Sequence, residues 1–155
     1  MRQPLKSPLA DLLDEEFEQV LRVIPPAFEA GVELHDAGAA IIESPNMAKI
    51  EKFLLNEMAV IEGISQQWQV MKLVKLKRPA MLTKDFCFRA YRANLRDQDH
   101  VVKYIPAECW HDLRYANMTM KESPMCLRYC PIPIRNVLRH IHRCEWLIFE
   151  DERPS

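Results

Sequence analysis

Apolar residues recur at steps of three, four and seven along most of the chain, which is the periodicity of an α-helix. The clearest run follows Ser44-Pro45 and continues to about Leu76. It comprises Met47, Ile50, Leu54, Ile61, Ile64, Trp68 and Met71. This pattern predicts one long helix over about 45–76, with Gly63 as a point where it could kink. Residues 70–77 also alternate in polarity, so a short strand there is the alternative.

Prolines separate the periodic segments and mark where helices begin and end. The further segments start at Ser7-Pro8, Ala27, Thr83, Pro106, Ser123-Pro124 and Pro133. Eleven prolines stand beside only three glycines, which favours helices joined by rigid corners over tight hairpins. The sequence therefore predicts an all-α fold of five or six helices, one of them long, joined by proline-marked corners.

Length and composition indicate a single helical domain over 1–155. The chain has 155 residues, 48% of them apolar, and shows neither a repeat nor a linker that would separate domains. We expect the N-terminal segment to be mobile and the charged tail "EDERPS" to be frayed.

Charge and segment composition limit which cellular compartments and which partners we expect. The net charge of -1 gives no general attraction to nucleic acid or anionic membranes. No apolar stretch approaches the ~20 residues of a membrane span, and residues 1–20 lack the apolar core of a secretory signal. We expect an intracellular, cytoplasmic protein, with mitochondrial import without a cleaved presequence as the alternative.

A stretch rich in cysteine and histidine, "MCLRYCPIPIRNVLRHIHRCEW", raises the question of a metal site. Cys126 and Cys130 are four residues apart, as are His140 and Cys144, so each pair would share one face of a helix. The corner "PIP" could fold the two helices into a hairpin. Four such ligands would suit tetrahedral zinc, so a zinc site is the alternative interpretation of this stretch.

The favoured interpretation of the same stretch is ordinary packing, with no cofactor. A last helix from Pro133 to about Phe149 would bury the apolar stripe of Ile134, Val137, Leu138, Ile141 and Ile148. Arg135, Arg139 and Arg143 would form the opposite, solvated stripe. Cys144 would flank the buried stripe, His140 would lie at its boundary, and the cysteines would be reduced. A disulfide that uses Cys87 or Cys109 remains a further alternative.

A basic region over 72–96 provides the candidate partner-binding residues. It combines "KLVKLKR" with "FRAYRANLR", in which arginines alternate with tyrosine. Such a region could meet the acidic surface of a protein, or it could contact nucleic acid, which we consider the less favoured partner. Together with the end of the long apolar stripe it predicts a partner surface made of Trp68, Met71, Lys72, Lys75, Arg89, Tyr91 and Arg92.

Signals of enzymatic activity are weak. The chain lacks a Gly-rich phosphate loop, G-x-S-x-G and H-E-x-x-H. Cys109 and His111 in "CWHD" would point apart by about 200° on a helix, so they would not form a nucleophile pair. We therefore expect a non-catalytic interaction or scaffolding protein, an accessory subunit that joins other protein subunits. The alternative is a small zinc-dependent nucleic-acid-binding or regulatory domain.

Overall fold

A computed structural model describes residues 12–28 and 45–152, and within these ranges the regular structure is entirely helical, without a strand. The α-helices are α1 (Asp14–Val23), α2 (Pro45–Leu54), α3 (Glu57–Gln66), α4 (Gln69–Lys77), α5 (Lys84–Ala93), α6 (Gln98–Val101), α7 (Ala107–Trp110), α8 (Leu113–Glu122) and α9 (Ile132–Ile141). Short 3-10 helices are η1 (Pro26–Phe28), η2 (Pro79–Met81), η3 (Val102–Tyr104), η4 (Pro124–Tyr129) and η5 (Glu150–Glu152). The predicted all-α class is confirmed. The described helices are more numerous and shorter than the five or six expected.

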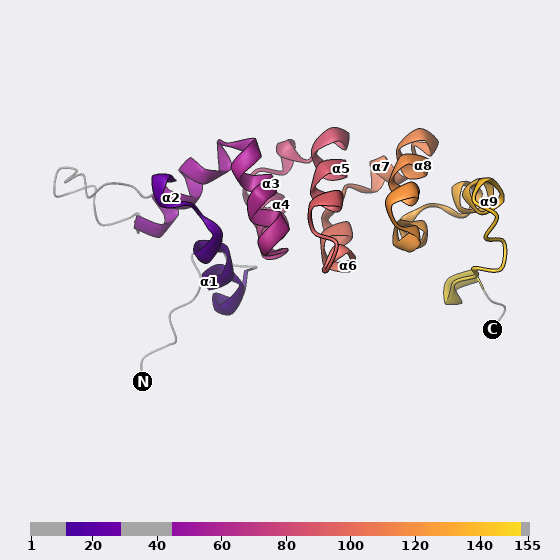
Figure 1. Ribbon diagram of the computed structural model, residues 1–155, viewed down its shortest axis with the longest axis horizontal. Helices are drawn as coiled ribbons and strands as arrows, with labels where there is room; N and C mark the ends of the chain where they lie inside the picture. The colour runs from indigo at the N-terminus through magenta and orange to yellow at the C-terminus, as the bar shows by residue number, and fades with distance from the viewer. Residues whose placement is uncertain (1–11, 29–44, 153–155) are drawn as a thin grey trace.

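From α2 to α9 the helices follow one another in a row along the long axis of the molecule (Figure 1). α3 packs on α2, α4 and α5, α5 packs on α6 and α8, and α8 packs on α7, η4 and α9. α1 covers α3 and α4 at the N-terminal end. Each helix therefore relies mainly on helices close to it in the sequence, as in stacked helical arrays.

The prediction of one long helix over 45–76 is wrong, because two breaks divide this segment into α2, α3 and α4. At the first break Asn56 adopts an extended conformation, and its side chain accepts a hydrogen bond from the Ala59 amide at 3.0 Å. The second break falls at Gln67, which is also extended. The alternative strand over 70–77 is wrong as well, since this stretch is the helix α4. The helix predicted from Ala27 lies outside the described residues beyond η1.

Several helices start where the sequence predicts, and local caps explain these starts. Thr83 caps α5 by accepting a hydrogen bond from the Phe86 amide at 3.2 Å. The single segment predicted from Pro106 is divided into α7 and α8, and Asp112, which carried no predicted role, caps α8 by accepting bonds from the amides of Arg114 and Tyr115, at 2.9 and 3.2 Å. Prolines begin α2, η2 and η4. These caps satisfy amides that a helix start leaves unpaired.

One continuous apolar core runs through the row, and buried polar side chains tie neighbouring helices together inside it. Asn94 donates to the carbonyl oxygen of Ile64 at 2.8 Å and thereby joins α5 to α3. Gln98 donates to the carbonyl oxygen of Tyr91 at 2.9 Å. Both side chains are buried, so their hydrogen bonds offset the cost of removing amides from water. No described helix has both the length and the apolar character needed to cross a bilayer.

The break between α2 and α3 can be tested at its cap. Asn56→Ala removes the bond to the Ala59 amide, and we expect it to lower the free energy of unfolding by about 1 kcal/mol. Met58→Ala in the same first turn is the control, because Met58 is 80% exposed and its loss should change stability by less than about 0.5 kcal/mol. Urea denaturation measures both. Equal stability of the two variants would contradict the role of Asn56 as a cap.

Candidate interaction site

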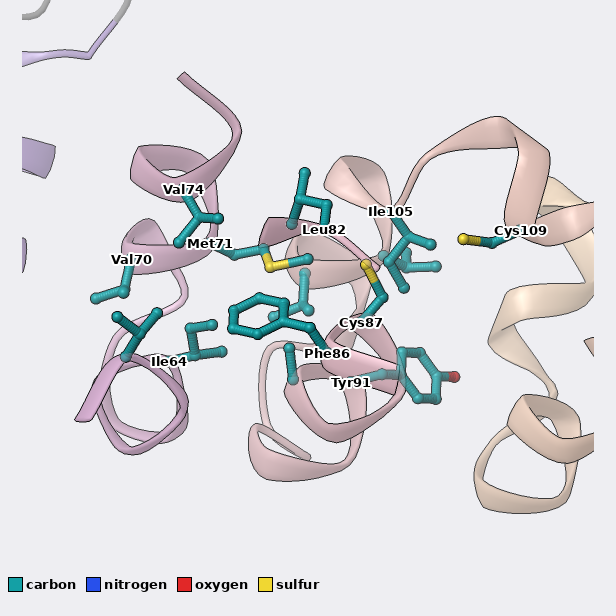
Figure 2. Close-up of a cluster of buried hydrophobic side chains, with 14 of the residues drawn as sticks. Ile64, Val70, Met71, Val74, Leu82, Phe86, Cys87, Tyr91, Ile105 and Cys109 are labelled. Atoms are coloured by element: carbon teal, nitrogen blue, oxygen red, sulfur yellow. The ribbon is translucent and has the colours of Figure 1, made fainter. Parts of the chain in front are cut away.

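Two of the predicted partner-binding residues lie in the core instead of on a surface. Met71 and Tyr91 are fully buried, and both belong to the apolar cluster drawn in Figure 2, where Met71 lies close to Phe86. The Tyr91 hydroxyl donates to the Ser123 carbonyl oxygen at 3.3 Å and links α5 to the end of α8. The predicted surface is therefore wrong for these two residues, because helical periodicity marks an apolar face without saying which element covers it. Trp68 is half-buried and stacks on the His100 ring, with centroids 4.4 Å apart.

Most cations of the predicted basic region are paired with acids of neighbouring helices. Lys72 meets Glu16 of α1 at 2.7 Å. Arg89 pairs with Asp85 at 3.0 Å and also with Glu57 of α3. The remaining pairs are Lys77 with Glu51, Lys84 with Asp112, Arg92 with Glu122 and Arg96 with Asp97, and Lys75 is exposed. The charges thus connect successive helices of the row, and the region is a poor match for a phosphate-binding face.

The four residues of the alternative zinc site do not come together. Cys126 and Cys130 are buried on and after η4, Cys144 is half-buried, and the His140 side chain is 88% exposed. The Cys130 thiol instead donates to the Cys126 carbonyl oxygen at 3.6 Å. Within the described ranges, three potential ligand atoms lie within 4.8 Å of one another only at Asp97, Asp99 and His100, sequence neighbours that are half-buried except for the exposed Asp99. The geometry therefore lends no support to zinc at the cysteine stretch.

The buried thiols are poorly suited to nucleophilic chemistry. All five cysteines are free. Burial raises the pKa of Cys87 to about 12 and that of Cys130 to about 11, and it also raises the pKa values of Cys109 and Cys126. A thiol that acts as a nucleophile at neutral pH needs a lowered pKa. These cysteines pack as small apolar side chains.

The feature that sequence reasoning missed is the orientation of α9. Arg135 and Arg139, predicted to form a solvated stripe, are buried, with side chains only 7% and 4% exposed. Val137 and Ile141, predicted to be buried, are 43% and 49% exposed, whereas Leu138 is buried as expected. The predicted burial pattern of the last helix is therefore wrong in these four positions. It is also wrong for Ile148, which is exposed and lies beyond the helix, because the helix ends at Ile141 instead of about Phe149.

The Arg135 guanidinium is held from two sides. Its Nε donates to the Cys130 carbonyl oxygen and one terminal nitrogen donates to the Arg128 carbonyl oxygen, both at 2.8 Å. These acceptors belong to η4 and its end. On the other side the guanidinium contacts Asp151 at 2.9 and 3.0 Å and Glu152 at 2.9 Å. The charge is buried, and it is compensated by both backbone carbonyls and carboxylates.

Arg139 forms a two-pronged contact with the same glutamate. Its terminal nitrogens donate to both carboxylate oxygens of Glu152, one of them at 2.6 Å, and its Nε donates to the Leu147 carbonyl oxygen at 2.8 Å. Asn136 on α9 accepts a further bond at 3.2 Å. Bidentate pairing of this kind combines charge with fixed geometry and is among the stronger polar contacts in proteins.

The carboxylates come from residues 144–152, which we call the strap. The strap follows α9 and returns along its arginine-bearing side, ending in η5. Phe149 of the strap lies against three guanidinium groups, with ring centroid distances of 5.3 Å to Arg128, 5.4 Å to Arg135 and 5.9 Å to Arg139. A frayed tail was expected from Glu150 onward, and this is wrong for Glu150–Glu152, where the Glu152 side chain is only 9% exposed.

An unusual backbone conformation connects α9 to the strap. Arg143 has a φ of 55°, in the left-handed region that glycine usually occupies at helix ends. Its amide donates to the His140 carbonyl oxygen at 3.3 Å, and the Cys144 amide donates to the Arg139 carbonyl oxygen at 2.9 Å. These two bonds define a Schellman ending of α9. A residue with a Cβ atom is strained there, so the contacts of the strap maintain the turn.

The two arginines lower the pKa values of the acids at the end of the strap. Hydrogen bonds from Arg139, followed by those from Arg135, lower the pKa of Glu152 to about 2. Hydrogen bonding to Arg135 likewise lowers the pKa of Asp151. Both carboxylates are therefore ionised throughout the neutral range. The strap is held by charge pairs that acid alone can neutralise.

Comparison of the chain with protein family models, with curated proteins and with solved structures finds no match in any of the three. The function is therefore inferred from the residues themselves. A signal for the site was present in the sequence, namely arginines four residues apart on one side of a helix, followed within 13 residues by an acid that reaches Arg139. The turn at Arg143, which brings the arginines and the acid together, contains no glycine from which the sequence could predict it.

The charge pairs predict a specific dependence of stability on pH. The pKa of Glu152 is lower in the folded chain than its ordinary value of 4.5, so its contribution is complete above pH 4.5 and is lost as the pH falls toward about 2. Glu152→Gln should lower the free energy of unfolding at pH 7 by about 2 kcal/mol. It should also reduce the acid sensitivity of stability between pH 4.5 and 2. Urea denaturation across this range measures both effects, and an unchanged acid profile in the variant would contradict the pairing.

Proposed function

We propose that the protein is a non-catalytic interaction protein, an accessory subunit that binds other protein subunits through the C-terminal end of its helical row. The observation that supports this most is the apolar edge of α9, which we define as Val137 and Ile141 together with the half-buried Ile134. These three residues are spaced along one side of the helix. A terminal helix of an isolated array is expected to present a polar outer face.

The position of the apolar edge supports a protein partner. α9 is the last helix of the row and is seen nearly end-on in Figure 1, so no further α-helix of the described chain stacks on it. Trp146, just beyond the helix, is 78% exposed and adds a large apolar side chain at the same end. Exposed apolar side chains, Trp among them, are enriched at binding surfaces between proteins.

Polar groups next to the apolar edge suit a surface that is solvated until a partner binds. The exposed His140 lies within 3.8 Å of Glu145, and Asn136 lies on the exposed side of α9. Interfaces between proteins commonly surround an apolar centre with such a polar rim. The buried thiols, the paired cations and the scattered zinc ligands offer no comparable support for catalysis or metal-dependent nucleic-acid binding.

A charge placed on the apolar edge tests the proposal. Ile141→Asp alters a half-exposed side chain, so the chain should keep its helical circular dichroism signal. The tagged full chain should recover a partner in fixed stoichiometry from the cells that produce it, and Ile141→Asp should reduce this recovery at least tenfold. Quantitative mass spectrometry of the purified complex measures the ratio.

Leu55→Asp is the matched control. Leu55 is 71% exposed and lies between α2 and α3, toward the opposite end of the row. This variant should recover the partner as the natural chain does. The proposal fails if the natural chain is recovered without any stoichiometric partner, or if Ile141→Asp retains the partner in full.

A further inference from the structure

The arginine-bearing side of α9 is a built carboxylate site that is filled by the chain's own strap. We propose that α9 and η4 form a receptor for an acidic, aromatic peptide segment of a partner protein, and that residues 147–152 occupy this receptor until the partner replaces them. This inference rests on the proposed function, since it names the chemistry of a second contact with a partner. The receptor uses the side of α9 opposite the apolar edge. Arg139 and Ile141 show this, because residues two apart on a helix point about 200° apart.

Groups outside the strap already hold the two arginine side chains of the receptor in place. The Arg135 guanidinium is fixed by the carbonyl oxygens of Arg128 and Cys130 at 2.8 Å. Asn136 holds the Arg139 guanidinium from within α9. The Arg139 Nε donates to the Leu147 carbonyl oxygen of the strap, and the donors that remain point at Asp151 and Glu152. Donors that are already oriented bind a carboxylate without first losing side-chain freedom, which favours recognition of an incoming acid.

The resident segment defines the class of ligand. Its Phe149 ring meets three guanidinium groups, and its Glu152 binds two of them. The Phe149 amide donates back to Glu152 at 3.3 Å, so the aromatic residue and the acid three positions later act as one compact unit. The expected ligand is therefore a segment with an aromatic residue three positions before a glutamate and with an acid beside that glutamate.

Several features indicate that the strap can be displaced. Its connection to α9 is strained at Arg143, where a non-glycine residue has a φ of 55°. An open groove of about 560 Å³ is lined by Arg128 and the strap residues Ile148–Asp151, so this edge of the strap borders solvent although Phe149 contacts Arg128. Trp146 within the strap is largely exposed. Segments with few buried apolar contacts open at low cost compared with the whole fold.

A different protein is a better occupant than a second copy of this chain. A copy whose own strap is docked has no free acidic segment to offer. Exchanging straps between two copies would replace each contact by an identical one, and it would add the entropic cost of association. A partner with a free acidic segment adds contacts elsewhere, such as those to the apolar edge, and these favour replacement of the strap.

The test uses a fluorescein-labelled peptide with the sequence of residues 147–152, LIFEDE, and the full chain. In the natural chain the attached strap competes at an effective concentration on the order of millimolar, so the peptide should bind weakly. Glu152→Gln weakens the attached strap, and the peptide should bind this variant at least tenfold more tightly by fluorescence anisotropy. The peptide should also raise the melting temperature of Glu152→Gln in a saturable manner, which keeps the test valid if the variant is less stable.

Three controls separate the possible outcomes. A peptide with amides in place of its last two acids should not bind. Glu150→Gln removes an exposed strap acid, and this variant should bind the peptide as weakly as the natural chain does. Ile141→Asp should bind the peptide as the natural chain does, even if it loses the partner. Absence of saturable peptide binding and of any melting shift in Glu152→Gln would show that the strap is a permanent part of the fold and would overturn the proposal. A dimer that forms only when Glu152 is present would identify a second copy as the occupant and would overturn the assignment to a different protein.

Discussion

Two buried guanidinium groups set the architecture of the C-terminal end. Removing a charged side chain from water is costly unless opposite charges and hydrogen-bond acceptors surround it. Arg135 and Arg139 meet this requirement through the carbonyl oxygens of η4 and the carboxylates of Asp151 and Glu152. Because these acceptors all lie on one side of α9, the arginines face inward. The apolar edge of the same helix consequently faces outward, and both proposed contacts with partners depend on this orientation.

The rest of the row follows a simpler rule, in which neighbouring helices share an apolar core and exchange charges at its rim. The basic region of α4 and α5 shows this clearly. Lys72 is neutralised by α1 and Arg89 by α3, so the region holds the row together more than it offers a free positive surface. Such local dependence leaves the two ends of the row as the places where the structure is least complete by itself.

The sequence was sufficient to predict the fold class and many helix starts, because caps and prolines act locally. Thr83 and Pro124 begin helical segments as their chemistry suggests. The break at Asn56 was missed since the step of seven from Leu54 to Ile61 fits a continuous helix equally well. The face of α9 was missed for a different reason. Hydropathy places arginine outside, and only a tertiary contact with an acid 13 residues further along, reached through a strained turn, places it inside.

The central claim is that Arg139 and Glu152 are energetically coupled and that this coupling orients α9. A double-mutant cycle tests it most directly, with Arg139→Gln, Glu152→Gln and the double variant compared with the natural chain by urea denaturation at pH 7. Glu152→Gln leaves the buried Arg139 charge without its acid, and Arg139→Gln leaves Glu152 with Arg135 alone. The double variant removes both charges of the pair, so the cycle isolates their coupling. We predict a coupling free energy of at least about 1.5 kcal/mol. Additivity of the two single changes within about 0.5 kcal/mol would contradict the account.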